Sequence, residues 1–417
     1  MKSGENTSMP TTKNRRPSRR AVIAGAAGLA FAQPFAIARA QGAPLKVGVV
    51  LPRSGPQGKI GQSCQQGYDL ALPILKELGY PEIQYMPVDT ETNVQRARAV
   101  TEKVIQDGAQ IVTGAFDSGA TTALAQVCEQ KGVPLVINIA AAPPITEQGY
   151  KFVFRNFPNG VRIAQDALNL QRELYEYKKD APKSAVLLHV NDTFGESLKA
   201  GLLGLMQRIE MPYKFADVIA YDPNARDLSV EIAKAKATGA ELLWTVSRLN
   251  DAMLLTRELI KQRWSPKAVV SSGPGFYEDQ YLKTLGKNGD HIISLVPWYD
   301  PSKPLTRYLL ERGAKAYPGI NIDTNHVYSF EAALICADAF KRAGSADPGK
   351  LRDALAATNI KNNVSIGPGI AFDAKGHNGG LGNAGIQNRG GKLKVVVPRA
   401  YADSEPVYPM PAWDKRA

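Results

Sequence analysis

The stretch Leu45-Lys46-Val47-Gly48-Val49-Val50-Leu51-Pro52 decides the fold of this chain. It is a short, mostly apolar run that stops at a proline, and this pattern is typical of a buried strand. Residues 60–77 follow with the apolar spacing of an amphipathic helix. A strand followed closely by a helix is the first half of a strand–helix–strand crossover unit.

The same alternation continues along the chain. Strands are expected at 82–88, 111–113, 135–139 and 152–154, with helices at 93–107 and at 118–131, the latter capped by Ser118. The rhythm restarts with strands at 184–189, 214–221, 242–245, 268–270 and 291–295 and helices at 194–209, 227–238, 250–263 and 276–286. Helices at 305–316, 328–343 and 348–358 and strands within 384–397 complete the pattern. The alternation predicts parallel α/β sheets with right-handed crossovers and helices on both faces.

The length of the chain predicts two lobes rather than one core. We expect two doubly wound, Rossmann-like lobes. The helices at 305–316, 328–343 and 348–358 need a sheet on which to pack, so the chain is expected to return to the first lobe to form them. The expected ranges are 44–159 and 296–373 for lobe 1, 160–295 and 374–398 for lobe 2, and 399–417 for a C-terminal tail. Three crossings between lobes form a hinge, and the carboxyl ends of both sheets then face a ligand cleft.

Residues 1–40 have the pattern of a bacterial export signal. Lys and Arg residues precede an uncharged run at 21–38, and Ala38-Arg39-Ala40 fits a signal-peptidase site. Ser18-Arg19-Arg20-Ala21-Val22-Ile23 resembles the twin-arginine export motif. We expect cleavage after Ala40 and a periplasmic mature protein. An uncleaved anchor is the alternative, although the run contains Pro34 and is only just long enough to span a bilayer.

Composition excludes several classes of function. The net charge is +12, and residues 1–40 account for six of these charges, with no basic cluster of the nucleic-acid kind in the remainder. Cys64, Cys128 and Cys336 lack metal or redox spacing, and all three are expected to be buried thiols in helices. The four His residues are scattered, and no hydrolase motif is present. The sequence therefore predicts no metal, no cofactor and no catalysis.

Several motifs, in this order, resemble one family. They are Lys46-Val47-Gly48-Val49-Val50-Leu51-Pro52-x-Ser54-Gly55-Pro56, Gly61-Gln62 with Gly67-x-x-Leu70-Ala71, Gly132-Val133-Pro134-Leu135-Val136, Asn191-Asp192-x-Phe194-Gly195 and Phe372-Asp373-x-Lys375-Gly376. The family is that of the periplasmic type I solute-binding proteins of ABC importers, in the leucine/isoleucine/valine-binding branch. The resemblance implies a two-lobed clamp that delivers a small solute to permease subunits in the inner membrane, and we expect it to be a monomer.

The resemblance also implies a set of ligand contacts. Ser118 matches the family's carboxylate-binding Ser, and a hydroxyl at a helix N-terminus suits an anion; a plain N-cap is the alternative. The other implied substrate-binding residues are Ser54, Gln57, Phe116, Ile139, Ala140, Ala141, Phe194, Ser247, Arg248 and Gly275. Phe194 either stacks on the solute or packs in the core. Arg248 either supplies a cation for the ligand carboxylate or is an ordinary exposed residue of the surface.

Two positions depart from the amino-acid binders of this family. Gly275 stands where they have a Glu that pairs the ligand ammonium, and Ala142 stands where they have a Thr hydroxyl. A buried ammonium without a carboxylate partner costs several kcal/mol. Asp117 and Asp192 are nearby carboxylates, and helix capping explains them as well as acid–base chemistry does.

The sequence therefore predicts a non-enzymatic periplasmic receptor for an amino-acid-like or carboxylic solute, with an aromatic acid among the candidates. A ligand-sensing subunit of a signalling system is one alternative, and an exported α/β hydrolase is the other.

Overall fold

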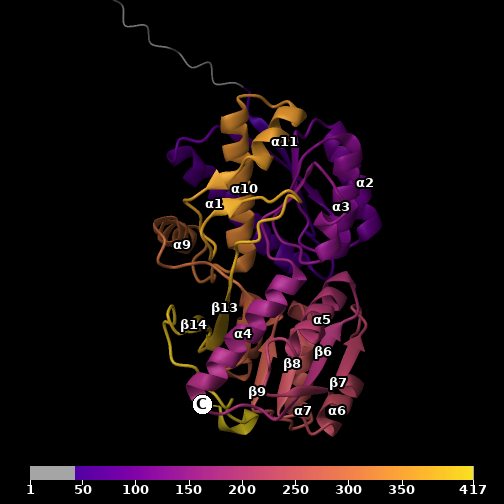
Figure 1. Ribbon diagram of the computed structural model, residues 1–417, viewed down its shortest axis with the longest axis vertical. Helices are drawn as coiled ribbons and strands as arrows, with labels where there is room; N and C mark the ends of the chain where they lie inside the picture. The colour runs from indigo at the N-terminus through magenta and orange to yellow at the C-terminus, as the bar shows by residue number, and fades with distance from the viewer. Residues whose placement is uncertain (1–42, 417) are drawn as a thin grey trace, which may run out of the picture. The chain divides into compact units, whose positions relative to one another are not determined.

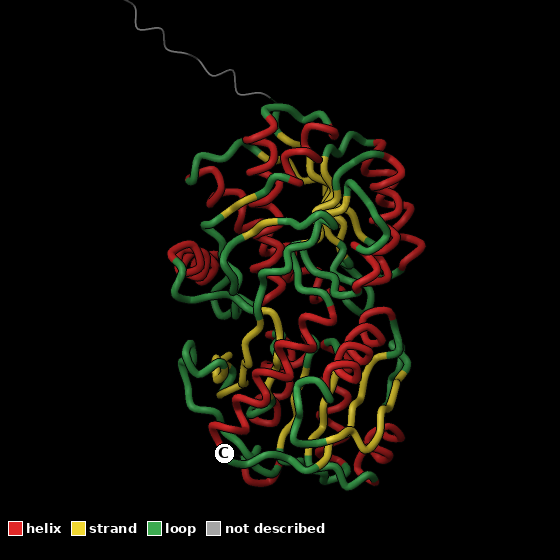
Figure 2. Tube along the Cα trace, viewed as in Figure 1, coloured by secondary structure: helices red, strands yellow, loops and turns green. Residues whose placement is uncertain are grey.

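The computed structural model describes residues 43–416, so the expected export signal lies outside the described residues. The described part holds two large sheets, each flanked by helices (Figures 1 and 2). We call the part built on the five-stranded sheet the first lobe and the part built on the seven-stranded sheet the second lobe. This is the predicted α/β architecture of two doubly wound lobes.

The first lobe has an entirely parallel sheet. Its strands, in spatial order, are β2 (Ile83–Asp89), β1 (Leu45–Leu51), β3 (Ile111–Gly114), β4 (Leu135–Ile137) and β5 (Val153–Arg155). Its helices are α1 (Gly58–Glu77), α2 (Val94–Gln106), α3 (Ser118–Lys131), α9 (Pro304–Ala316), α10 (Thr324–Ala343) and α11 (Pro348–Ala356). Successive β1 side chains face opposite layers: Val49 packs in the cluster that contains Cys64 of α1, and Val50 packs in the cluster that contains Leu124 of α3.

The second lobe has a mixed sheet. Its strands, in spatial order, are β14 (Lys392–Val397), β13 (Asn383–Arg389), β10 (Ile293–Pro297), β9 (Ala268–Ser271), β8 (Leu242–Val246), β6 (Ser184–Val190) and β7 (Lys214–Tyr221). Its helices are α4 (Gly160–Lys178), α5 (Thr193–Met206), α6 (Ser229–Ala237), α7 (Leu249–Lys261) and α8 (Asp279–Leu285). Strands β13 and β14 run antiparallel, unlike the expected parallel pairing. Gly390 and Gly391 form their two-residue turn with positive φ, and so short a turn joins only antiparallel strands.

The chain passes between the two sheets three times. It leaves the first sheet after β5, returns after β10 to form α9 and α10, and leaves again after the short strands β11 (Asn359–Ile360) and β12 (Ile370–Ala371). Short 3₁₀ turns complete the fold: η1 (Pro143–Thr146), η2 (Pro274–Phe276), η3 (Gly286–Gly289) and η4 (Trp413–Lys415). We propose lobe limits near residues 159, 296 and 373, close to these passages.

The caps of α3 and α10 differ from what the sequence predicted. The N-cap of α3 is Asp117, whose carboxylate accepts from the Ala120 amide, and Ser118 is the first helical residue. Helix α10 begins at Thr324 rather than at 328, because Asp323 and His326 form a reciprocal capping box. A His in place of the usual Glu or Gln conceals this signal in the sequence.

The C-terminal segment packs on the second lobe. Tyr408 and Met410 are buried, and the Arg416 guanidinium donates to the carbonyl oxygens of Asn288 and Asp290 at 2.7 and 2.9 Å. Residues 399–416 therefore form part of that lobe's packing.

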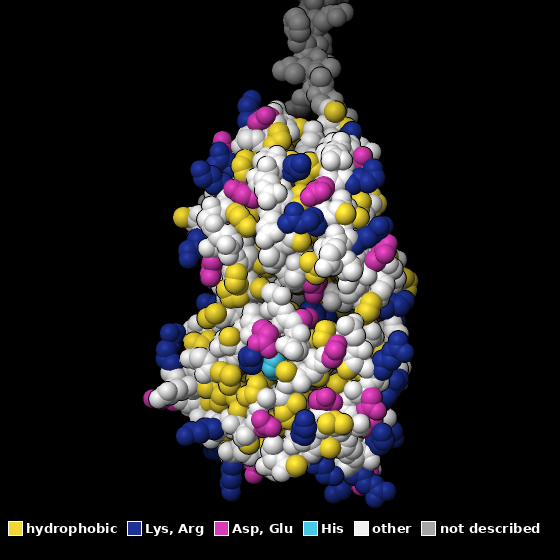
Figure 3. All heavy atoms as spheres, turned by 90° about the vertical axis from the view of Figure 1, so that its right-hand side faces the viewer, with side chains coloured by type: hydrophobic (Ala, Val, Ile, Leu, Met, Phe, Trp, Pro, Cys, Tyr) yellow, Lys and Arg dark blue, Asp and Glu magenta, His cyan; other side chains and the backbone are white. Residues whose placement is uncertain are grey.

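All three cysteines are buried and free, and each lies in a helix as predicted. Within residues 43–416 no helix has the length and apolar character needed to cross a membrane, and no group of ligating side chains is placed to hold a metal ion. On the face shown in Figure 3, Lys and Arg side chains lie among Asp and Glu rather than in one basic patch.

Helices α1 and α10 pack closely because of a glycine in α1. A Cβ atom at Gly67 would lie 2.2 Å from the carbonyl oxygen of His326, which is backbone and cannot rotate away. The glycine therefore sets the distance between these helices and the position of the α10 N-terminus.

We predict that Gly67→Ala lowers the free energy of unfolding by about 1–3 kcal/mol, because α1 and α10 must separate. Gly204→Ala is the matched control: Gly204 is also helical, and a Cβ there meets nothing within 4 Å. We expect it to be neutral or stabilising by up to about 1 kcal/mol. Urea denaturation of both variants checks this, and equal stabilities would contradict it.

Candidate functional site

A cavity lies between the two lobes at the carboxyl ends of both sheets. It encloses about 480 Å³ of empty space, including its opening to solvent. The lining residues are Phe116, Ser118, Ile139, Ala140, Ala141, Phe157, Ile163, Phe194, Arg248, Ser272, Gly273, Pro274, Tyr277, Val296, Pro297, Thr324 and Asn325.

Seven of the expected contact residues line this cavity together. They are Phe116, Ser118, Ile139, Ala140, Ala141, Phe194 and Arg248. Each lies just beyond the end of a parallel strand, where the side chains of neighbouring loops converge.

Four expected contact residues do not line the cavity. The hydroxyl of Ser54 donates to Asp89 at 2.7 Å, and Gln57 lies beside Asp117 in a neighbouring hollow. Ser247 is buried, and its hydroxyl oxygen has no partner. A Cβ at Gly275 would lie 2.4 Å from the carbonyl oxygen of Arg248. This position therefore has no room for a side chain, because η2 packs directly on the backbone of Arg248.

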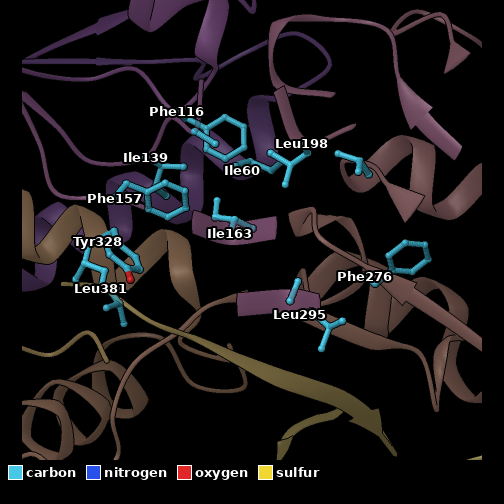
Figure 4. Packing of buried hydrophobic residues seen from close by; sticks show 14 of the residues in the cluster. Ile60, Phe116, Ile139, Phe157, Ile163, Leu198, Phe276, Leu295, Tyr328 and Leu381 are labelled. Atoms are coloured by element: carbon cyan, nitrogen blue, oxygen red, sulfur yellow. The ribbon is translucent and has the colours of Figure 1, made fainter. Parts of the chain in front are cut away.

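The middle of the cavity is apolar. Phe116, Ile139, Phe157 and Ile163 come from different loops and helices and converge on one another (Figure 4). Phe116 has a φ of 77°, a region that bulky residues rarely adopt, so its surroundings hold it in this conformation. These surfaces suit a ring or a branched chain.

One end of the cavity is suited to an anion. Ser118 stands at the first position of α3, and the Asp117 cap takes only the Ala120 amide, which leaves the Ser118 and Gly119 amides without helical acceptors. The Ser118 oxygen accepts from the Ala142 amide at 3.3 Å, so its own hydrogen is free to donate. A carboxylate placed here would meet a hydroxyl and the positive end of the helix dipole.

A buried cation stands behind the loop at this end. Arg155 is fully buried and donates to the carbonyl oxygens of Ala140 and Ala142, at 3.5 and 2.7 Å, and to Thr146 and His377. Burial lowers the pKa of Arg155 to about 10, so it stays charged at neutral pH. Burial, and then the Arg155 charge, lowers the pKa of His377 to about 4, which leaves its ring neutral to accept from Arg155.

Arg248 joins the two lobes through both arms of its guanidinium. One arm contacts Asp192 of the second lobe at 2.6 Å, and the other contacts Asp117 of the first lobe at 3.0 Å. Burial alone would lower the pKa of Arg248, but the Asp192 and Asp117 carboxylates outweigh it and raise the pKa. The guanidinium also lies 5.0 Å from the centre of the Phe194 ring.

This arrangement balances the charges beside the cavity. Asp117 caps α3 and Asp192 caps α5, so two helix N-termini, each worth about half a positive charge, lie next to one guanidinium and two carboxylates. The sum is close to zero. Arg248 is therefore engaged with protein carboxylates, and it is not a free cation for the ligand.

Sequence reasoning missed the remaining lining residues. Phe157 and Ile163 follow the first passage between lobes, Val296 and Pro297 precede the second, and Thr324 and Asn325 open α10. The available signal was Asp323, an N-cap residue directly before Thr324 and Asn325.

The fold and the interlobe cavity define the class of two-lobed solute-binding proteins. The chain belongs to the periplasmic binding protein family, whose model matches residues 44–382. This is a family of solute-binding proteins and not of enzymes, which rules out the hydrolase alternative.

Two curated relatives are similar over most of the chain. "Leu/Ile/Val-binding protein homolog 7" of Brucella suis is 24% identical, covering 90% of this chain and 97% of that protein. The "Leucine-, isoleucine-, valine-, threonine-, and alanine-binding protein" of Pseudomonas aeruginosa is 23% identical, covering 80% of this chain and 86% of that protein.

Solved structures share the fold. A leucine-binding protein from Thermotoga maritima matches with a TM-score of 0.72 at 18% identity, covering 84% of this chain and 97% of that one. A solute-binding protein of an ABC transporter from R. palustris, in complex with benzoate, matches with a TM-score of 0.72 at 19% identity, covering 88% of this chain and 99% of that one.

We predict that Asp117→Asn opens the lobes, whereas Asp192→Asn does not. Asn at position 117 keeps the helix cap but loses the ion pair with Arg248 across the lobes. Hydrogen bonds to charged groups are worth about 1.5–3 kcal/mol. The ratio of closed to open molecules should therefore fall about tenfold or more in Asp117→Asn.

Distances between spin labels attached through K103C on α2 and K261C on α7 measure this ratio. Both lysines are exposed, and the native cysteines are buried. Identical distance distributions in the wild type and both variants would contradict the prediction.

Proposed function

We propose that this protein is the substrate-binding component of an ABC importer and captures a small organic carboxylate, aromatic or branched, between two closing lobes. Family membership supports the binding role. The solute contacts loops of both lobes, and closure follows because it binds the closed form more tightly than the open one.

One observation carries the choice of ligand class: the lining contains no Asp or Glu among the described residues. Two nearby carboxylates, Asp117 and Asp192, are paired with Arg248, and the carboxyl groups of Glu278 and Asp323 lie behind the Asn325 amide, outside the lining. An α-ammonium in this cavity would lack an anionic partner, whereas a carboxylate has Ser118 and the α3 amides. The buried charge of Arg155 behind residues 140–142 adds to the preference for an anion.

Known ligands of similar proteins fall into both classes. One similar structure holds isoleucine and another holds benzoate. The fold is therefore compatible with either kind of solute, and we base the choice on the lining of this cavity. The ring-sized apolar surfaces of Phe116, Phe157 and Phe194 favour an aromatic acid.

Export completes the proposal. We propose that residues 1–40 are a twin-arginine signal cleaved after Ala40, and that the mature monomer delivers its solute to permease subunits of the inner membrane. Replacing Arg19 and Arg20 by Lys should trap the precursor in the cytoplasm, because the export receptor reads paired guanidiniums. N-terminal sequencing of the exported wild type should begin at Gln41, and unimpaired export of the variant would contradict the twin-arginine route.

We predict that deaminated acids bind more tightly than the matching amino acids. An unpaired ammonium should cost roughly 1–3 kcal/mol, about tenfold to a hundredfold in affinity. Calorimetric titration with leucine and 4-methyl-2-oxopentanoate, and with phenylalanine and phenylpyruvate, measures the difference. Tight binding of leucine without binding of its keto acid would overturn the proposed ligand class.

A further inference from the structure

The N-termini of helices α3 and α10 both face the cavity. They differ in the hydrogen-bonding groups that they offer to a ligand. At α3 the first two amides are left free, as described above. At α10 the Asp323 carboxylate accepts from the Asn325 and His326 amides, at 2.9 and 3.3 Å, so these donors are already used. The α10 end is therefore closed to an anion.

The α10 end offers an acceptor instead. Asn325 lines the cavity with 1% of its surface exposed, and its side-chain oxygen has no hydrogen-bond partner. A buried amide oxygen without a partner costs free energy, so its presence in a binding cavity indicates a group that the ligand satisfies.

The orientation of the Asn325 amide is set by its neighbours. Its nitrogen donates to Glu278 at 2.5 Å and more weakly to Asp323 at 3.4 Å. The Asp323 carboxylate and one oxygen of Glu278 accept here, which places the nitrogen on this side and leaves the amide oxygen without a protein partner. Asp323 is itself fixed by a 2.7 Å contact with His326 Nδ1.

The group behind Asn325 is the buried carboxyl of Glu278, which is 3% exposed and does not itself line the cavity. Burial, and then the nearby Asp323 charge, raises the pKa of Glu278 well above its usual value, which favours the neutral carboxyl. The cavity thus meets a neutral amide oxygen here and no free carboxylate.

We propose that Asn325 determines specificity by accepting a hydrogen bond from a hydroxyl group of the ligand, so that the solute is a hydroxylated carboxylic acid. This rests on the proposed function: the carboxylate occupies the α3 end, and the hydroxyl satisfies Asn325. Glu278 is a positioning residue, because it acts by orienting the amide.

The test is calorimetric titration of the full mature protein with benzoate, its three monohydroxy isomers and the matching methoxybenzoates. At least one hydroxybenzoate should bind tenfold or more tightly than benzoate, because it satisfies the buried oxygen. Its methoxy analogue, which cannot donate, should show no gain. The three isomers cover the possible positions of the hydroxyl around the ring.

Asn325→Leu should lose the preference for the hydroxyl, so that the variant binds benzoate and the preferred hydroxybenzoate with equal affinity. Asn321→Ala is the control, because the Asn321 amide also donates to an acidic side chain, Asp279 at 2.6 Å, but lies outside the cavity lining. This control should keep the preference.

Two results would overturn the inference. One is equal binding of benzoate and all three hydroxybenzoates to the wild type, a comparison that needs no variant to fold. The other is a hydroxyl preference that survives in Asn325→Leu. Either result leaves the proposed function intact. Failure of every benzoate in the panel to bind would overturn the inference as well, and the proposed function would fall with it only if 4-methyl-2-oxopentanoate and phenylpyruvate also failed to bind.

Discussion

The ion pair between Arg248 and Asp117 is the contact on which this closed arrangement depends. Asp117 and Asp192 cap helices that begin at the ends of strands in different lobes, and both carboxylates meet beside the cavity. Two carboxylates brought together without a cation repel each other. The guanidinium of Arg248 contacts both, and the amide of Asn250 adds a 3.2 Å bond to the carbonyl oxygen of Pro56 in the other lobe.

The same pairing determines what the cavity can bind. Because Arg248 neutralises the cap of α3, the free amides of that helix and the Ser118 hydroxyl can act on an anion without a competing negative charge. Arg155 strengthens this end from behind, since its carbonyl contacts hold the loop at 140–142. The α10 end is capped by its own Asp323 and presents an acceptor. The cavity therefore offers hydrogen-bond donors at the N-terminus of α3, an acceptor at the N-terminus of α10, and apolar surface between them.

Much of the fold could be predicted from the sequence, because apolar periodicity reports burial within one sheet and its covering helices. Ser118, Ile139 and Phe194 could be placed in the site because the family resemblance implies ligand contacts in the loops that follow strands. Asn325 and Phe157 could not, because they follow passages between lobes, and local patterns do not report which loops meet across a cleft. Gly275 was expected to be a ligand contact and to mark the absence of the Glu that pairs the ligand ammonium. The structure shows that the backbone packs too closely around Gly275 for any side chain to fit there.

A crystal structure of the protein with a bromobenzoate bound tests the central claim most directly, because the bromine's anomalous signal fixes the orientation of the ring. The account predicts the carboxylate within hydrogen-bond distance of the Ser118 hydroxyl and the Gly119 amide, with Arg248 still paired to Asp117 and Asp192. A carboxylate bound instead to the Arg248 guanidinium, with Asp117 displaced, would contradict it.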